Sequence, residues 1–424
     1  MRKINIKHFL ILFILSLLPT IIFLLFIEQP EVEKVGDSYD YINLAKNIMK
    51  GKGYCDETGN FSVARPPLYP FVLSVIFKFF GENNFTTARF ANVIFHVITT
   101  ISVFYLSKYF LPTDLALLSG IITAINPYHI FNTGFILTES FLTMMITLSF
   151  LFLFNLIKVN RYKYVIITGI FWGMLTLTKA VSFLYPFFVC PFLIWRTKKF
   201  HFLIWIVIIC LTISPWVIRN YKVTGRFLLS DTKGGWVFFT ATLPVKRVIE
   251  WGELPQQKAI IEEMDRLGIF NPVDRDRYLI KVALKNIKRC PWMYLKLVIF
   301  RMIKFVAPYR YWQVLKGYAV IGKYSFLYYI AFFINLLLFF FVIVNFIMFI
   351  MNKEKIIYSF IITSGILYHW LVYALISDAS PRFSVPLYPL VIVNGLYFLY
   401  KIFSNYKNSA EIIFNNEKQK LFNI

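Results

Sequence analysis

Apolar stretches about twenty residues long recur along this chain of 424 residues, and they restrict its fold more than any other feature of the sequence. A helix of about 20 apolar residues is long enough to cross the hydrocarbon core of a bilayer. The composition agrees, because 58% of the residues are hydrophobic and only 16% are charged, against roughly 45–50% and about 25% in soluble domains. We therefore predict an all-α polytopic membrane protein.

Ten spans are predicted, and the charge of their loops sets the orientation. The loops that begin at Lys158, Arg196 and Asn352 are short and basic, as cytoplasmic loops usually are. All three lie inside if the N-terminus is cytoplasmic and residues 219–323 stay outside without a net crossing. The most apolar part of that segment, residues 291–308, carries lysine and arginine at helical spacing and is expected to lie flat in the membrane interface. The predicted spans are 9–27, 86–110, 114–131, 136–157, 164–180, 182–196, 201–218, 324–351, 357–376 and 385–402.

Residues 1–403 are thus expected to form one transmembrane domain, followed by a short cytoplasmic tail at 404–424. Two large outer segments, 28–85 and 219–323, are expected to carry short amphipathic helices, including one over 41–50 and one that begins at Pro66. Both termini then lie on the cytoplasmic side of the plasma membrane. Cys55 and Cys290 both fall in outer segments, so their pairing is left open.

The net charge of +23 fits a membrane protein better than a nucleic-acid-binding protein. Lysine and arginine gather in cytoplasmic loops and at the depth of anionic headgroups. No nucleic-acid-binding motif accompanies the charge. We therefore expect membrane lipids, and not nucleic acid, as the partners of these cations.

Ionisable residues in or near the spans are functional candidates, because each costs roughly 2.5–3.5 kcal/mol to insert. Each also has a structural explanation: a solvated loop acid, a carboxylate at a helix N-terminus, an arginine that reaches lipid phosphates, or a packed histidine. Their shared position at the outer side is the stronger signal. These residues are Asp37, Asp40, Arg65, Glu139, Lys179, Arg219, His369 and Arg382.

Several short motifs in fixed order give the chain a family resemblance. The chain resembles the polyprenyl-phosphate-sugar-dependent glycosyltransferases of the GT-C superfamily, which include the protein O-mannosyltransferases and the lipid A aminoarabinose transferase. The motifs are Gly36–Asp40 with Gly51–Tyr54, Arg65–Pro70, Asn126-Pro127 with Leu137–Glu139, Leu177–Lys179, Pro215–Tyr221 and Pro381–Pro389.

This resemblance implies a GT-C-type helical bundle that moves one sugar from a polyprenyl-phosphate donor to an acceptor hydroxyl, with inversion. It implies Asp37 as the general base, and Asp40 is an alternative because Ser38 stands where relatives carry a second acid. Glu139 would orient the acceptor or join Asp37 around a divalent metal ion. The acceptor is a lipid, a glycan or a protein.

The resemblance also implies which cations bind the donor phosphate. Arginine and lysine would stabilise the phosphate as it leaves, since preorganised charge usually supplies the largest catalytic contribution. The stronger candidates are Arg65, Lys179 and Arg382, and the weaker ones are Arg219 and His369.

Three other functions fit the same composition. The first is an oligosaccharide ligase of the same fold, which transfers a preassembled block. The second is a lipid or solute transporter, although no matching halves of the kind common in transporters occur here. The third is a scaffold, in which Asp37 and Glu139 would be dispensable.

Overall fold

The computed structural model describes residues 6–26, 36–159, 161–197, 199–243, 255–307, 326–351 and 357–404. Within these ranges the fold is helical, with an isolated bridge between Cys55 and Phe61 and no strand, which confirms the predicted all-α class. The first half contains α1 (Ile6–Phe26), α2 (Gly36–Met49), α3 (Leu68–Phe80), α4 (Phe85–Ser107), α5 (Thr113–Ala124), α6 (Pro127–Asn132), α7 (Thr138–Val159), α8 (Tyr162–Thr178), the short turn η2 (Ala180–Ser182) and α9 (Tyr185–Thr197). The second half contains α10 (His201–Thr224), α11 (Lys233–Ala241), α12 (Pro255–Arg266), α13 (Pro272–Arg289), α14 (Pro291–Phe305), α15 (Phe326–Ile350), α16 (Ile357–Ile376), the turns η5 (Pro381–Phe383) and η6 (Val385–Leu387), and a final helix over 388–404.

Each of the ten predicted spans has a helical counterpart. By length and composition, seven apolar helices of the described ranges can cross a membrane: α1, α4, α7, α10, α15, α16 and the segment Pro381–Ser404. The predicted span 114–131 is divided between α5 and α6, because Pro127 starts a new helix and the Asn126 side chain accepts the N–H of Tyr128 at 2.9 Å. The predicted cytoplasmic tail and the loop at 352–355 lie outside the described residues, apart from Ser404.

Helix α7 is the central element of the bundle. It packs against α4 and α8, and most of its side chains are buried. No charged residue occurs between Glu139 and Lys158. Other helices can therefore pack around α7 without burying a charge within this stretch. Its first turn therefore lies inside the protein, and this places Glu139 in a buried position.

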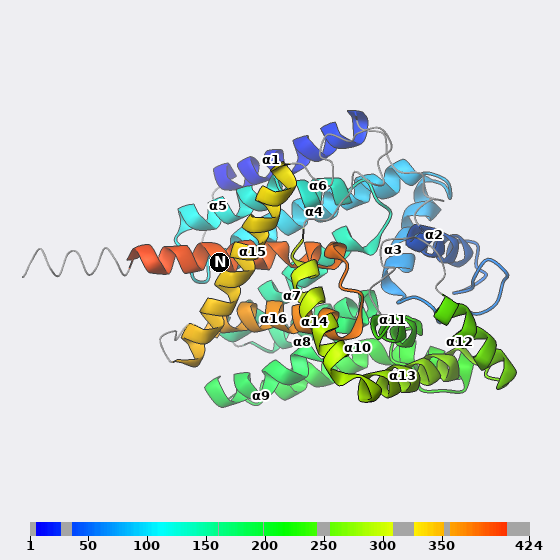
Figure 1. The fold of residues 1–424 in the computed structure, drawn as a ribbon. Coiled ribbons are helices and arrows are strands. Elements are labelled where there is room, and N and C mark those ends of the chain that lie inside the picture. The colour runs from blue at the N-terminus through cyan, green and yellow to red at the C-terminus, as the bar shows by residue number, and fades with distance from the viewer. Residues whose placement is uncertain are drawn as a thin grey trace, which may run out of the picture.

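The shorter helices α2, α3, α11, α12 and α13 gather at one end of the bundle (Figure 1). Helix α2 begins at Gly36, five residues before the predicted helix over 41–50, because Asp37 in its first turn complements the helix dipole. Asp37 and Asp40 are consequently one helical turn apart. Gly51 and Gly53, both with positive φ, then reverse the chain toward α3.

Helix α14 confirms the helix predicted within 291–308, but one of its charged side chains points into the protein and not to its surface. Arg301 is buried and donates hydrogen bonds to the carbonyl oxygens of Ala374, at 3.2 Å, and Ala241. The exposed face carries apolar side chains such as Trp292 and Ile299. The guanidinium is therefore satisfied by the ends of α11 and α16 and not by solvent.

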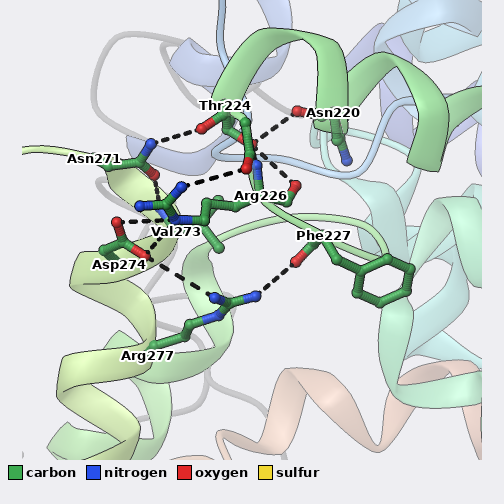
Figure 2. A network of polar contacts seen from close by, with 9 residues as sticks. Asn220, Thr224, Arg226, Phe227, Asn271, Val273, Asp274 and Arg277 are labelled. Carbon is green, nitrogen blue, oxygen red and sulfur yellow. Dashed lines mark hydrogen bonds and ion pairs between the residues drawn. The ribbon is translucent and has the colours of Figure 1, made fainter.

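The segment after α10 is tied back to the bundle by a polar network (Figure 2). Gly225, with φ of 66°, ends α10. The Asn271 side chain caps α13 and also donates to the Thr224 carbonyl oxygen at 2.8 Å. Arg226 pairs with Asp274 at 3.1 Å, and Arg277 donates to the Phe227 carbonyl oxygen at 3.2 Å. These contacts fix where α13 starts.

All four cysteines are free in the structure. Cys55 is buried and its thiol donates to the Lys52 carbonyl oxygen at 3.1 Å, whereas Cys290 is exposed. The Cys55–Cys290 pair that the sequence left open is therefore not formed.

Candidate active site

Asp37 joins two arginines that are distant in sequence. Its Oδ1 accepts a hydrogen bond from Arg65 Nη2 at 2.6 Å, and its Oδ2 accepts one from Arg382 Nη2. Burial alone would raise the pKa of Asp37, but the charges of Arg382 and Arg65 outweigh burial and hold that pKa well below its usual range. The carboxylate is therefore ionised and engaged on both oxygens.

Asp40 shares Arg65 with Asp37. Arg65 Nε and Nη2 both donate to Asp40 Oδ2, at 2.9 and 2.6 Å. The guanidinium also lies over the ring of Tyr41, with its carbon 5.3 Å from the ring centroid. The side chain of Asp40 is 41% exposed and that of Asp37 is 27% exposed, so Asp40 is the more accessible carboxylate.

Glu139 lies deeper than either aspartate, in the first turn of α7, with 4% of its surface exposed. Its Oε1 lies 3.6 Å from Arg382 Nε. Its Oε2 is buried without a hydrogen-bond partner among the described residues. A buried carboxylate oxygen left open is a ready acceptor for a ligand hydroxyl or a water molecule.

Arg382 links the two acidic positions. It lies in η5, where Pro381 starts the turn, and it contacts both Asp37 and Glu139. Lys179 follows α8, and its Nζ lies 5.0 Å from the centroid of the Phe383 ring. Lys179 is close enough to Glu139, Arg382 and Asp37 to interact with them electrostatically.

Two predicted residues do not join this cluster. Arg219 donates to the backbone carbonyl oxygens of Ser62 and Tyr54, at 2.6 and 3.0 Å. His369 is buried, with Nδ1 2.8 Å from the Gly365 carbonyl oxygen and Nε2 3.1 Å from Ser182 Oγ. Both side chains thus connect elements around the site.

Two charged residues near this cluster were not predicted to lie there. Asp231 and Lys233, at the start of α11, interact electrostatically with Arg65, and Asp231 also with Lys179. Burial raises the pKa of Asp231, and its carboxylate accepts the Lys233 N–H at 3.1 Å. The polar sequence 230–233 resembles an ordinary loop before a helix, so only the fold reveals its position.

The carboxylates do not form an open cage for a divalent ion. Hard cations need several free oxygen ligands, whereas both oxygens of Asp37 are taken by guanidinium groups. In the described ranges no three histidine, cysteine or acidic side chains come together in a metal-binding arrangement. The predicted metal role of Asp37 and Glu139 stays a prediction.

Comparisons with known proteins give one family match and several fold matches. Residues 64–218, which include Arg65, Glu139 and Lys179, match the family described as dolichyl-phosphate-mannose-protein mannosyltransferase. No curated protein gives a significant sequence match. Among solved structures, the apo oligosaccharyltransferase of Archaeoglobus fulgidus has a TM-score of 0.53 at 13% identity, over 97% of this chain and 52% of that one. The same enzyme tethered to an acceptor peptide has a TM-score of 0.52 at 15% identity, over 95% and 50%.

ArnT from Cupriavidus metallidurans in its apo state also matches, with a TM-score of 0.43 at 14% identity, over 93% of this chain and 78% of that one. The chain spans about half the length of the archaeal oligosaccharyltransferase. The fold match and the family match confirm the predicted resemblance to the GT-C glycosyltransferases. The chain is an integral membrane protein with this fold.

Proposed function

We propose that this protein moves a single sugar from a polyprenyl-phosphate donor to an acceptor hydroxyl, with inversion, at the outer face of the membrane. One observation carries the proposal: Arg65 and Arg382 converge on Asp37, beside the open carboxylate oxygen of Glu139. The cluster thus contains cations that can bind a phosphate and a carboxylate that can act as a general base. The family matched by residues 64–218 is named for a dolichyl-phosphate donor, which is the same donor class.

The arginines would bind the donor phosphate. Arginine suits this role because its guanidinium contacts phosphate with two parallel hydrogen bonds. Without donor, Arg65 and Arg382 are bound to Asp37. A donor phosphate would compete with Asp37 for these charges and would leave the carboxylate free to accept a proton. Lys179 would add a third positive charge to the leaving phosphate.

Asp37 is the preferred base, and Asp40 is the alternative. The acceptor oxygen would form a bond to the anomeric carbon while its proton passes to the carboxylate. The bond from that carbon to the phosphate oxygen breaks, and its electrons leave with the phosphate. Base catalysis of this kind contributes about 10²–10⁴-fold, and attack from the opposite face gives inversion. Glu139 Oε2 would accept a hydrogen bond from the acceptor or the sugar.

An apolar cavity of about 520 Å³ would hold part of the prenyl chain. It lies among α9, α14, α15 and α16. One of its lining residues, Tyr368, donates to the Val181 carbonyl oxygen at 2.7 Å, two residues after Lys179. The cavity therefore lies close to the segment that follows Lys179, one of the cations that would bind the phosphate. Its lining residues are Tyr185, Phe188, Val189, Met302, Phe346, Phe360, Ser364, Leu367, Tyr368, Trp370 and Leu371.

The direct test is transfer by the purified protein from labelled polyprenyl-phosphate sugars, read by the mass of the product. Asp37→Asn should lower kcat by about 10²–10⁴-fold, while Asp114→Asn, an exposed acid in the first turn of α5, should leave transfer unchanged. If Asp40→Asn abolishes transfer and Asp37→Asn does not, Asp40 is the base. If neither substitution has an effect, the proposed site is wrong.

A second candidate is transfer of a preassembled oligosaccharide. The observation that favours it is the fold shared with the archaeal oligosaccharyltransferase over 97% of this chain. The same assay separates the two, because a single transferred sugar adds one hexose or pentose mass to the acceptor and a block adds several.

A further inference from the structure

Side chains of α4 hold the short turn that leads into Glu139. Asn92 Nδ2 donates to the carbonyl oxygens of Thr133, at 3.3 Å, and Phe135, at 2.8 Å. Arg89 Nε donates to the carbonyl oxygen between them, that of Gly134, at 3.0 Å. Residues 89 and 92 are three apart, so they share one face of α4. Two side chains of α4 thus donate hydrogen bonds to three consecutive backbone carbonyl groups.

These bonds lie in a buried environment. Asn92 is 1% exposed, Thr133 is 0% exposed and Phe135 is 3% exposed. A buried carbonyl group without a partner costs about 1–3 kcal/mol, and the turn between α6 and α7 has no regular ladder to supply one. The donors from α4 therefore favour one conformation of residues 133–135.

Glu139 depends on that conformation. Its Oε1 lies 3.6 Å from Arg382 Nε, and its Oε2 has no hydrogen-bond partner among the described residues. The held turn ends at Phe135, and only residues 136–138 separate it from Glu139. The backbone position of α7's first turn therefore sets where the carboxylate lies.

We propose that Arg89 and Asn92 are positioning residues that act through Glu139. The inference rests on the proposed function, because it requires Glu139 to take part in transfer. Neither side chain needs to touch the donor or the acceptor. A displacement of about 1 Å in a reacting group can cost on the order of 10²-fold in rate, so loosening this turn lowers kcat more than it raises KM for the donor.

The test uses Asn92→Leu, which keeps the branched shape of the side chain and removes the donor. It should lower kcat by about 10- to 100-fold. Asn345→Leu is the matched control, because Asn345 is also buried and donates from Nδ2 to Asn394 Oδ1 at 2.8 Å, between α15 and the final helix. Asn345→Leu should lower the thermal stability and leave kcat unchanged. Arg89→Lys, which keeps a donor, should retain more activity than Arg89→Leu.

A double-mutant cycle with Glu139→Gln decides the mechanism. If Asn92 acts through Glu139, then Asn92→Leu causes no further loss of kcat in the Glu139→Gln background. A full additional loss there, or an unchanged kcat for Asn92→Leu alone, would overturn the inference. If Glu139→Gln itself transfers sugar normally, the role of Glu139 in the proposed function fails, and the inference fails with it. If only the Asn92 result is negative, the proposed function stands.

Discussion

Asp37 carries two guanidinium charges on one carboxylate, and this pairing predicts a pH effect. The pKa of Asp37 is depressed in the folded protein. The ionised carboxylate therefore stabilises the fold at pH values above the ordinary pKa of an aspartate. This stabilisation is lost as the pH falls through the lower pKa of the folded state. Arg382→Gln removes one of the two charges. The pKa of Asp37 should then rise, and the acidic limb of kcat/KM should move to higher pH.

The measurement is kcat/KM against pH for the wild type and Arg382→Gln. Arg226→Gln is the control, because Arg226 is paired with Asp274 away from the cluster, and its acidic limb should match the wild type. An acidic limb that stays in place or moves to lower pH in Arg382→Gln would show that Asp37 does not control this ionisation.

The sequence could predict which residues gather but not all of their contacts. Membrane sidedness and motif order selected Asp37, Asp40, Arg65, Glu139 and Arg382, and the structure brings them together. Other predicted site residues bond neutral groups of the protein such as backbone carbonyl oxygens, which occur throughout any chain and leave no sequence signal. Arg219 and His369 are the examples.

At the scale of elements, the contact between α11 and α13 depends on one glycine. A Cβ at Gly235 would overlap the backbone carbonyl oxygen of Asp276, so Gly235→Ala should destabilise the protein by about 1–3 kcal/mol. Gly234 has open space at the same point, so Gly234→Ala should keep or slightly raise stability. Thermal unfolding in detergent compares the two. Equal midpoints would contradict the close packing of α11 on α13.

Element boundaries were harder to predict than element positions. The sequence placed a helix from Pro66 and one within 291–308, and α3 and α14 occur there. It did not predict that Arg301 points inward, because helical periodicity gives the spacing of charges and not the partner that each will face. The carbonyl ends of α11 and α16, which bond Arg301, come from segments 60 and 73 residues away.

At the scale of the molecule, the apolar cavity predicts how donor length affects transfer. Leu367→Trp should fill part of the cavity and raise KM for a long-chain polyprenyl-phosphate sugar, since prenyl groups displaced from the cavity into lipid lose their packing contacts with its lining residues. A short-chain donor that does not reach the cavity should keep its KM. Equal effects on both donors would place the prenyl chain elsewhere.

The helical bundle itself was the most predictable level, because long apolar segments restrict the fold strongly. The convergence of distant segments was not visible in composition. Asp37 and Arg382 are 345 residues apart and form an ion pair. The proposed function requires that ion pair and its location at the non-cytoplasmic face of the membrane.

Cysteine labelling tests both requirements in one measurement. Asp37→Cys and Arg382→Cys are introduced in a chain whose four native cysteines are replaced, and sealed cells are treated with an impermeant maleimide and then with a short bis-maleimide cross-linker. We predict that both positions react from outside and that the cross-linker joins them. Reaction of the two positions from opposite sides of the membrane would contradict the account.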